Sequence, residues 1–307
     1  MILLFLFALL PRIEIVSAND TSVTYRELMP LRVALDPTTR LFHYKGCRDV
    51  RPDMEWVSPA AALLRGYKEH ACVSLRKDEY ATQSETRAAR DSAHISVLFI
   101  GNSLTYFNEM PHMTSEIAAH ESRPLRVEAV TQSGASLEDL WYRTDALKHI
   151  WKEHWDYVIF QERGGGEAHN RGELFHQYVR MFADQIRRSG AKPVLFMTWS
   201  LQHAAENEAL YRNAAKRANV RLLPVGMAWD QRFDWDGVHP NVAGSYLIAC
   251  MSYATIYDKP PLGLPFEFRH LANKDEFYDA ALLQQTLNET QAREIQEAAW
   301  RAVQRAK

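Results

Sequence analysis

Cysteine is scarce in this chain of 307 residues: only Cys47, Cys72 and Cys250 are present, and no two of them have CxxC spacing. The histidines include no HExxH pair, so neither common zinc motif is found. We therefore expect no metal and no cofactor. Export of the protein would allow Cys47 and Cys72 to form a disulfide, and Cys250 is then expected to be a small core residue in a helix.

An excess of charge of either sign is also absent, because 36 basic and 38 acidic residues give a net charge of −2. Such a balance excludes the basic surface typical of proteins that bind nucleic acid or anionic membranes. The apolar run at residues 2–10 is too short for a bilayer span, which takes about 20 residues. It suits a secretory signal cleaved near Ala18, although no basic residue precedes it. The alternatives are a buried strand or a start codon placed too far upstream, so export and a cytoplasmic location both stay open, as does the oligomeric state.

The chain is expected to divide into parts of different character. Residues 1–18 are a possible signal peptide, and residues 19–92 form an extension of unknown role that shows no sustained period. Its last part, residues 76–92, is polar and charged, which indicates a linker or a solvated helix. An α/β domain is predicted for residues 93–262, and residues 263–307 are predicted to be a connector and C-terminal helices.

Short apolar strands alternate with helices in the predicted α/β domain. The strands are predicted at 95–100, 125–130, 156–160, 194–198 and 221–225, and the helices at 110–122, 137–151, 171–188, 204–218 and from 242. This alternation favours a three-layer α/β/α fold with a five-stranded, parallel, flavodoxin-like sheet. Ligands of such sheets bind at the carboxyl ends of the strands.

Residues suited to nucleophilic catalysis follow these strand ends. Ser103 comes directly after the first strand, where it could be a nucleophile or simply a helix cap. Asp236 and His239 lie three residues apart, so a histidine base and the carboxylate that orients it can share one loop. The alternative for this pair is a polar turn before a helix. Asp234 is a second acid nearby, with less suitable spacing.

Two further strand ends offer donors for a developing oxyanion. Gly134 follows the second strand, where its backbone N–H can approach a ligand, although a simple turn glycine is the alternative. Gln161 ends the third strand, and its side-chain amide could donate to the same oxyanion. Trp141, Trp151 and Trp155 could line a cleft for sugars but are more typical of a core. The candidate substrate contacts are Asn102, Glu162, Arg163, Trp199 and Trp235.

Together these motifs resemble those of the SGNH/GDSL hydrolase superfamily over residues 94–260. Gly101-Asn102-Ser103-Leu104 is similar to the first block of the family, with Asn102 where Asp is usual. Gly134 matches the glycine of the second block. Gln161-Glu162 occupies the third block, where the family has an Asn, and Asp236-Gly237-Val238-His239 matches the DxxH block in full. The chain resembles a subgroup with GNSL in block one and Gln-Glu in block three.

The resemblance implies a serine esterase that works through an acyl-enzyme. It assigns Ser103 as nucleophile, His239 as base and Asp236 as the orienting acid, with an oxyanion hole made by Ser103, Gly134 and Gln161. An O-acetyl carbohydrate is the favoured substrate because of the surrounding tryptophans. The alternatives are an acyltransferase with the same triad and an inactive carbohydrate-binding protein on the same fold.

Overall fold

The computed structural model describes residues 12–28, 33–44, 48–57, 62, 65–70, 80–164, 168, 172–268 and 287–307. The chain forms two compact units, Met1–Thr86 and Arg87–Lys307. The second unit begins before the predicted boundary at residue 93 because Arg87 is buried in it, where its guanidinium donates to the Ser189 carbonyl at 2.6 Å. It also includes the C-terminal helix that was predicted to lie outside the α/β domain.

A five-stranded parallel sheet forms the centre of the second unit. Its strands are β8 (Ile95–Gly101), β9 (Leu125–Thr131), β10 (Tyr157–Gln161), β11 (Lys192–Phe196) and β12 (Arg221–Leu223). They lie in the order β12-β11-β10-β8-β9. Numbered along the chain this is the 2-1-3-4-5 order of flavodoxin-like sheets, so the predicted fold class is confirmed.

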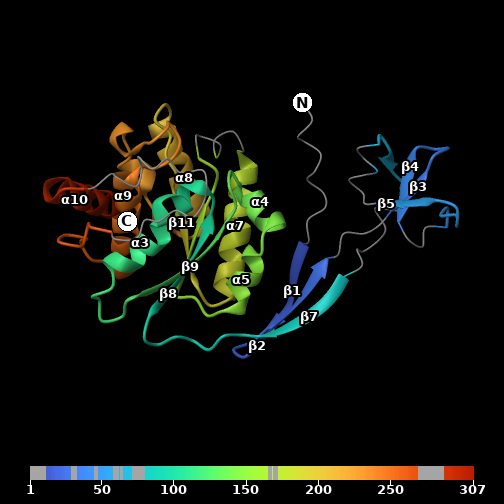
Figure 1. The fold of residues 1–307 in the computed structure, drawn as a ribbon, viewed down its shortest axis with the longest axis horizontal. Helices are drawn as coiled ribbons and strands as arrows, with labels where there is room; N and C mark the ends of the chain where they lie inside the picture. The colour runs from blue at the N-terminus through green and yellow to red at the C-terminus, as the bar shows by residue number, and fades with distance from the viewer. Residues whose placement is uncertain are drawn as a thin grey trace. The chain divides into compact units, whose positions relative to one another are not determined.

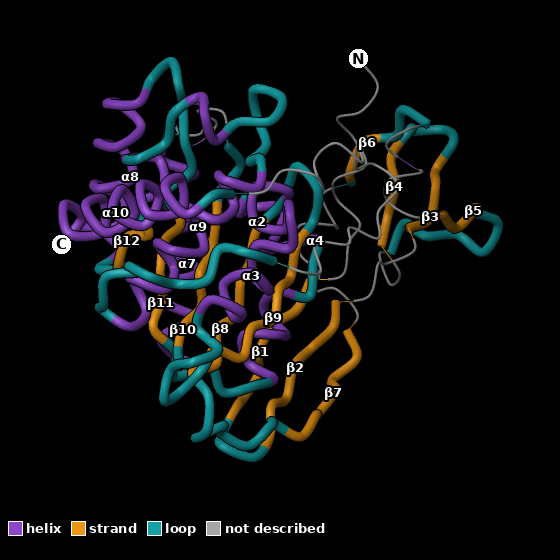
Figure 2. Tube along the Cα trace, turned by 60° about the vertical axis from the view of Figure 1, so that its left-hand side comes forward, coloured by secondary structure: helices purple, strands orange, loops and turns teal. Residues whose placement is uncertain are grey.

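Helices cover both faces of this sheet (Figures 1 and 2). One face carries α3 (Met110–Ile117), α9 (Val242–Tyr257) and α10 (Glu289–Ala306). The other carries α4 (Leu137–Arg143), α5 (Ala146–Lys152), α7 (Glu173–Arg188) and α8 (Ala204–Ala218). The crossovers that connect parallel strands are right-handed. The step from β8 to β9 runs along the sheet in the direction opposite to the later steps, so its helix α3 lies on the face opposite to the helices of those steps.

The core lies on both sides of the sheet. Residues 97–100 of β8 have no exposed surface, as expected for a central strand covered by helices on both faces. Helix α9 is apolar over nearly its whole circumference because the sheet, α3 and α10 all pack against it. Cys250, on α9, is fully buried and unpaired, which confirms its predicted place in the core.

The described residues of the first unit form two small sheets. Strands β1 (Arg12–Ala18), β2 (Ser22–Leu28) and β7 (Tyr80–Thr86) form an antiparallel sheet. Strands β5 (Glu55–Val57), β3 (Val33–Asp36), β4 (Leu41–Tyr44) and β6 (Lys68–Glu69) form the other, in that order.

Strand β7 corrects the sequence prediction of a linker or solvated helix at residues 76–92. It pairs with β2 along its whole length, from Ser22 opposite Thr86 to Leu28 opposite Tyr80. This pairing joins segments that are far apart in the chain, so local polarity gives no sign of it. The end of the predicted signal peptide, 12–18, is strand β1, whereas residues 1–11, Cys47 and Cys72 lie outside the described residues.

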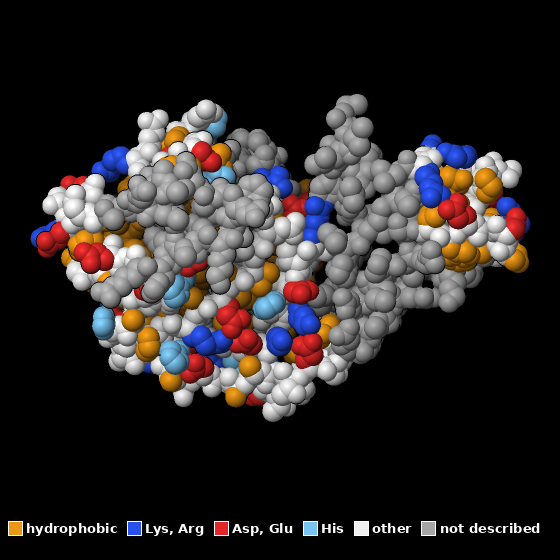
Figure 3. Space-filling model, in the orientation of Figure 1, with side chains coloured by type: hydrophobic (Ala, Val, Ile, Leu, Met, Phe, Trp, Pro, Cys, Tyr) orange, Lys and Arg blue, Asp and Glu red, His pale blue; other side chains and the backbone are white. Residues whose placement is uncertain are grey.

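The described surface has mixed charge. On the face drawn in Figure 3, acidic and basic side chains of the described residues lie interspersed over the second unit. Among the helices that the structure describes, none has both the length and the apolar character required to span a bilayer.

Candidate active site

Ser103 is the first residue of the short helix α2 (Ser103–Tyr106), which starts directly beyond β8. Asn102 caps this helix, with its Oδ1 accepting from the Leu104 N–H at 3.0 Å. A Cβ at Gly101 would collide with the side chains of Thr105 and Gln161, so this position requires glycine. The close approach of strand and helix thus holds Ser103 at the carboxyl edge of the sheet, where the sequence predicted it.

The structure brings together Ser103, His239 and Asp236. The Oγ of Ser103 lies 3.0 Å from His239 Nε2, and His239 Nδ1 lies 2.8 Å from Asp236 Oδ2. The other oxygen of Asp236 accepts from the backbone N–H groups of Val238 at 3.0 Å and His239 at 2.8 Å. These bonds hold the loop so that acid and base, three residues apart, face each other.

The electrostatics of the loop separate the two neighbouring acids. Burial favours a raised pKa for Asp236, but the hydrogen bonds from His239 and Val238 outweigh it and hold the pKa below the ordinary value. Asp236 is therefore ionised at neutral pH and accepts from the imidazole. Burial raises the pKa of Asp234, and Asp234 makes no hydrogen bond to His239.

Two residues that the sequence did not single out position the base. The ring of Phe107 stacks on that of His239, with 4.2 Å between centroids and 6° between planes. The side-chain amide of Asn108 donates to the Pro240 carbonyl at 3.1 Å and to Ser245 Oγ at 2.9 Å. Asn108 has φ of 52°, a left-handed conformation that asparagine adopts more readily than most residues.

Gln161 does not have the role predicted for it. Its Nε2 donates to Asn102 Oδ1 at 2.9 Å and to the Glu162 carbonyl at 2.6 Å, so both amide hydrogens are engaged. Its Oε1 accepts from the Asn102 N–H at 3.1 Å and from Thr105 Oγ1 at 2.7 Å, and the side chain is fully buried. Gln161 therefore has no hydrogen left for an oxyanion, and instead it holds α2 against β10.

The loop at Gly134 lies between β9 and α4 and is held by two side chains. Arg163 Nε donates to the Gly134 carbonyl at 2.6 Å, and Asn102 Nδ2 donates to the Ala135 carbonyl at 2.8 Å. Gly134 has φ of +63°, in the left-handed region that favours glycine. Among the described residues, neither Gly134 nor Ser103 uses its backbone N–H in a hydrogen bond to the protein. Both groups are thus available as donors.

Three of the predicted substrate contacts are buried instead. Asn102 and Glu162 are 1% and 0% exposed, and Glu162 Oε1 accepts from the Arg163 N–H at 2.7 Å. Trp199 is 4% exposed and stacks on Trp229 at 3.5 Å within the core. Each of these side chains thus has hydrogen-bond or packing partners in the interior, and its contact with a substrate stays a prediction.

Arg163 and Trp235 remain partly exposed. The guanidinium of Arg163 is already bonded, to Gly134 and to Asp139 at 3.1 Å, so it supports the loop. Trp235 lies in the loop of the triad, where its N–H donates to the His239 carbonyl. Among the predicted contacts, Trp235 keeps an indole ring that a substrate could reach.

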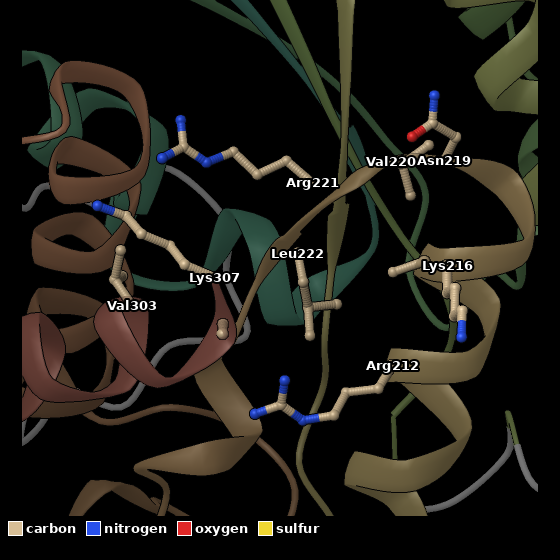
Figure 4. A pocket seen from close by; sticks show the side chains of 10 residues that line it. Arg212, Lys216, Asn219, Val220, Arg221, Leu222, Val303 and Lys307 are labelled. Carbon is tan, nitrogen blue, oxygen red and sulfur yellow. The ribbon is translucent and has the colours of Figure 1, made fainter.

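A cavity of about 630 Å³, seen from close by in Figure 4, is lined by none of the triad residues. Arg221, the first residue of β12, lines it, so the cavity is at the amino edge of the sheet and Ser103 at the opposite edge. Its cations are largely paired: Arg212 with Glu208 at 2.9 Å and Lys307 with Asp258 at 2.5 Å. The described residues that line this cavity include no nucleophile beside a base.

Comparisons with known proteins extend to solved structures only, since no family model and no curated protein matches the chain. A protein assigned to the SGNH hydrolases, from Slackia heliotrinireducens, is 28% identical, with 53% of this chain and 99% of that one covered and a TM-score of 0.45. A DUF4886 family protein from Bacteroides uniformis is 17% identical, with 69% and 95% covered and a TM-score of 0.49. TesA is 20% identical, with 54% and 99% covered and a TM-score of 0.43. Similarities of this degree transfer no residue role to this chain.

The chain's own fold and residues define its class. A parallel sheet in the 2-1-3-4-5 order carries a serine, a histidine and an aspartate in hydrogen-bond contact at its carboxyl edge. This chain therefore resembles the SGNH/GDSL hydrolases in its fold as well as in its sequence motifs.

Proposed function

We propose that this protein is a serine esterase that hydrolyses a carboxylic ester through an acyl-enzyme. The observation that supports the proposal is the continuous chain of hydrogen bonds from Ser103 through His239 to Asp236. Such a chain gives a hydroxyl, which is a weak nucleophile on its own, a base within reach and a carboxylate that fixes the tautomer of that base.

The reaction proceeds in two steps. Ser103 Oγ attacks the ester carbonyl while His239 Nε2 takes its proton, and His239 returns that proton to the leaving alkoxide. Water, deprotonated by His239, then attacks the acyl group and releases the carboxylic acid and Ser103. The backbone N–H groups of Ser103 and Gly134 donate to the oxyanion in both steps. Loss of one such donor typically costs about 100- to 1,000-fold in rate, so a hole without a side-chain amide remains compatible with catalysis.

The substrate is proposed only at the level of the ester. The preference for an O-acetyl carbohydrate depended on tryptophans around the site, but Trp151, Trp155 and Trp199 are buried in the core. Among the candidate cleft residues, Trp141 and Trp235 are partly exposed and keep that preference. Hydrolysis rates for p-nitrophenyl esters of increasing acyl length, compared with the rate for an acetylated sugar, measure whether the enzyme prefers a carbohydrate ester.

The test of the mechanism is labelling with a fluorophosphonate, with the adduct mapped by mass spectrometry. We expect the label on Ser103 of the wild type and no label in Ser103→Ala. His239→Ala should label at least about 100-fold more slowly, because general-base assistance typically contributes 10²- to 10⁴-fold.

Ser133→Ala is the matched control, since Ser133 is an exposed serine in the neighbouring loop. It should label like the wild type. A His239→Ala variant with full activity would contradict the proposed mechanism. A folded wild type that takes up no label would contradict it too and would favour the inactive binding protein.

A further inference from the structure

Three side chains of the kind that bind metals converge in the first unit, far along the chain from the triad. His43, Asp49 and His70 each offer one ligand atom, and these atoms all lie within 4.8 Å of one another. His70 Nε2 is 3.7 Å from Asp49 Oδ2, and the two imidazole centroids are 4.3 Å apart with 36° between their planes.

Strand register brings the two histidines together. Strands β4 and β6 pair in parallel, with Phe42 opposite Glu69, and the His70 N–H donates to the Phe42 carbonyl at 3.1 Å. Figure 2 shows β6 beside β4. The next position along both strands brings His43 opposite His70, and facing residues of paired strands project to the same side. Asp49 follows in the turn after β4.

The distances suit one ion held between the three groups. The separation of 3.7 Å is too long for a hydrogen bond. It is close to the roughly 3.4 Å expected between two ligands of a tetrahedral ion with bonds of about 2.0–2.1 Å. Opposite ligands of one ion are at most about 4.2 Å apart. A ligand pair at the outer limit of 4.8 Å would therefore need a small rotation of a ring.

The burial and charge of the cluster also suit a cation. His43 is 2% exposed, and the carboxylate of Asp49 lies beside the two imidazoles. Arg48 pairs with Oδ1 of Asp49 at 3.8 Å, whereas His70 lies next to Oδ2 of the same carboxylate. Arg51 pairs with Asp36 at 3.5 Å, so the carboxylate of Asp36 offsets the charge of this guanidinium.

We propose that His43, Asp49 and His70 bind one divalent ion of the zinc class and that the ion clamps β4 to β6. Two imidazoles and a carboxylate match the ligand preference of zinc, whereas magnesium and calcium prefer oxygen. Asp49 and His70 have side chains 47% and 27% exposed, which leaves a coordination position for water.

A clamp here has a structural purpose. The strands of this sheet span only residues 55–57, 33–36, 41–44 and 68–69, so it can bury little apolar surface. Small units of this kind often obtain stability from a metal, whose binding free energy adds to that of folding. No regular spacing connects His43 to His70, which is why the sequence predicted no metal.

The test uses the full chain, purified without a polyhistidine tag and stripped with a chelator. Zn²⁺ is titrated in competition with a chromophoric chelator at pH 7.5, and we expect one equivalent to bind while Mg²⁺ does not compete. Asp49→Asn and His70→Ala should each weaken binding by at least about 10- to 100-fold, the cost typical of losing even an outer partner of a metal site.

Asp53→Asn is the matched control, because Asp53 is an acid of the same unit with its side chain 77% exposed. It should bind Zn²⁺ like the wild type. Zn²⁺ should also raise the melting temperature of the wild type and leave that of Asp49→Asn unchanged. Circular dichroism of each variant shows that it remains folded.

Equal affinity of the wild type and His70→Ala would overturn the proposal, since the other histidines of the chain would then account for binding. The titration is repeated in a chain that carries Cys47→Ser and Cys72→Ser. Retained affinity is the expected result, and its loss would assign the ion to thiolates instead. The proposal does not depend on the esterase, so either can fail without the other.

Discussion

Asp236 illustrates how one residue can serve both the loop and the reaction. One of its oxygens accepts from two backbone N–H groups of its own loop, and the other accepts from the imidazole of His239. The first set of bonds fixes the carboxylate, so the second can fix the orientation and tautomer of the ring. Both sets are stronger while the carboxylate is charged.

Asp236→Asn tests this dual role. We expect activity to fall by about 10³- to 10⁴-fold, because an amide can donate to the ring nitrogen and favour the wrong tautomer. Steady-state kinetics on a p-nitrophenyl ester measure the loss. Asp234→Asn removes a neighbouring charge that has no hydrogen bond to His239, and it should retain activity within about tenfold. Equal losses in the two variants would show that general electrostatics of the loop, and not orientation, explain the effect.

The same carboxylate predicts a pH dependence of stability. The pKa of Asp236 is lower in the folded protein than in the unfolded chain, where it is about 3.9. Its stabilising contribution is therefore complete above about pH 4 and is lost as the pH falls through the folded pKa. The difference in melting temperature between the wild type and Asp236→Asn should accordingly shrink between pH 6 and pH 3. A difference that stays constant over this range would mean that the charge of Asp236 does not stabilise the fold.

At the scale of elements, helix α4 links the oxyanion loop to the rest of the domain. Ser136 and Asp139 form a capping box, in which the Asp139 N–H donates to Ser136 Oγ at 3.2 Å and the Ser136 N–H donates to Asp139 Oδ2 at 2.9 Å. Asp139 Oδ2 also accepts from Arg163, which holds the Gly134 carbonyl. The start of the helix and the position of Gly134 are therefore connected.

Ser136→Ala should lower the free energy of unfolding by about 1 kcal/mol, the usual cost of losing such a cap. It should also slow fluorophosphonate labelling, because the loop that carries the Gly134 N–H loses an anchor. Urea denaturation and labelling rates measure the two effects. Ser133→Ala, on the exposed side of the same loop, is expected within about 0.5 kcal/mol of the wild type. Labelling of Ser136→Ala at the wild-type rate would show that the helix cap does not affect the position of the Gly134 N–H.

The predicted helix at 137–151 shows the limit of periodicity for elements. Two helices occupy this range, and they are separated at Thr144. The hydroxyl of Thr144 donates to the Leu140 carbonyl at 2.6 Å and accepts from the Ala146 N–H at 3.2 Å, so it ends one helix and begins the next. Apolar spacing continues across the break because both helices pack on the same face of the sheet, and this is why the sequence indicated one helix.

At the scale of the whole molecule, the boundary between the two units determines what can fold alone. Arg87 is 6% exposed, and its guanidinium donates to the carbonyls of Ser189 and Glu153. The Ala88 N–H donates to the Lys152 carbonyl at 3.0 Å. Arg87 is therefore buried in the second unit and Ala88 is hydrogen-bonded to it, although the sequence before β8 is polar.

A fragment of residues 87–307 should fold and take up the fluorophosphonate like the full chain. A fragment of residues 93–307, which starts at the boundary expected from sequence, should be less stable by about 1–3 kcal/mol because it lacks these buried hydrogen bonds. Thermal melts of the two fragments measure the difference. Identical melts would mean that residues 87–92 contribute nothing to the fold.

The sequence by itself determined the features that depend on neighbours along the chain. Short apolar runs and helical periods placed the five strands and most helices, and the three-residue spacing placed Asp236 beside His239. Only the tertiary structure decided the contacts between distant segments, such as Ser103 with His239 across 136 positions. The tertiary structure also decided the two hydrogen bonds that occupy the side-chain amide of Gln161 and the burial of Trp199. It likewise decided the pairing of β7 with β2 and the contact between His43 and His70. Local patterns reflect the preference of each segment, whereas these contacts depend on which segments the chain reversals and crossovers bring side by side.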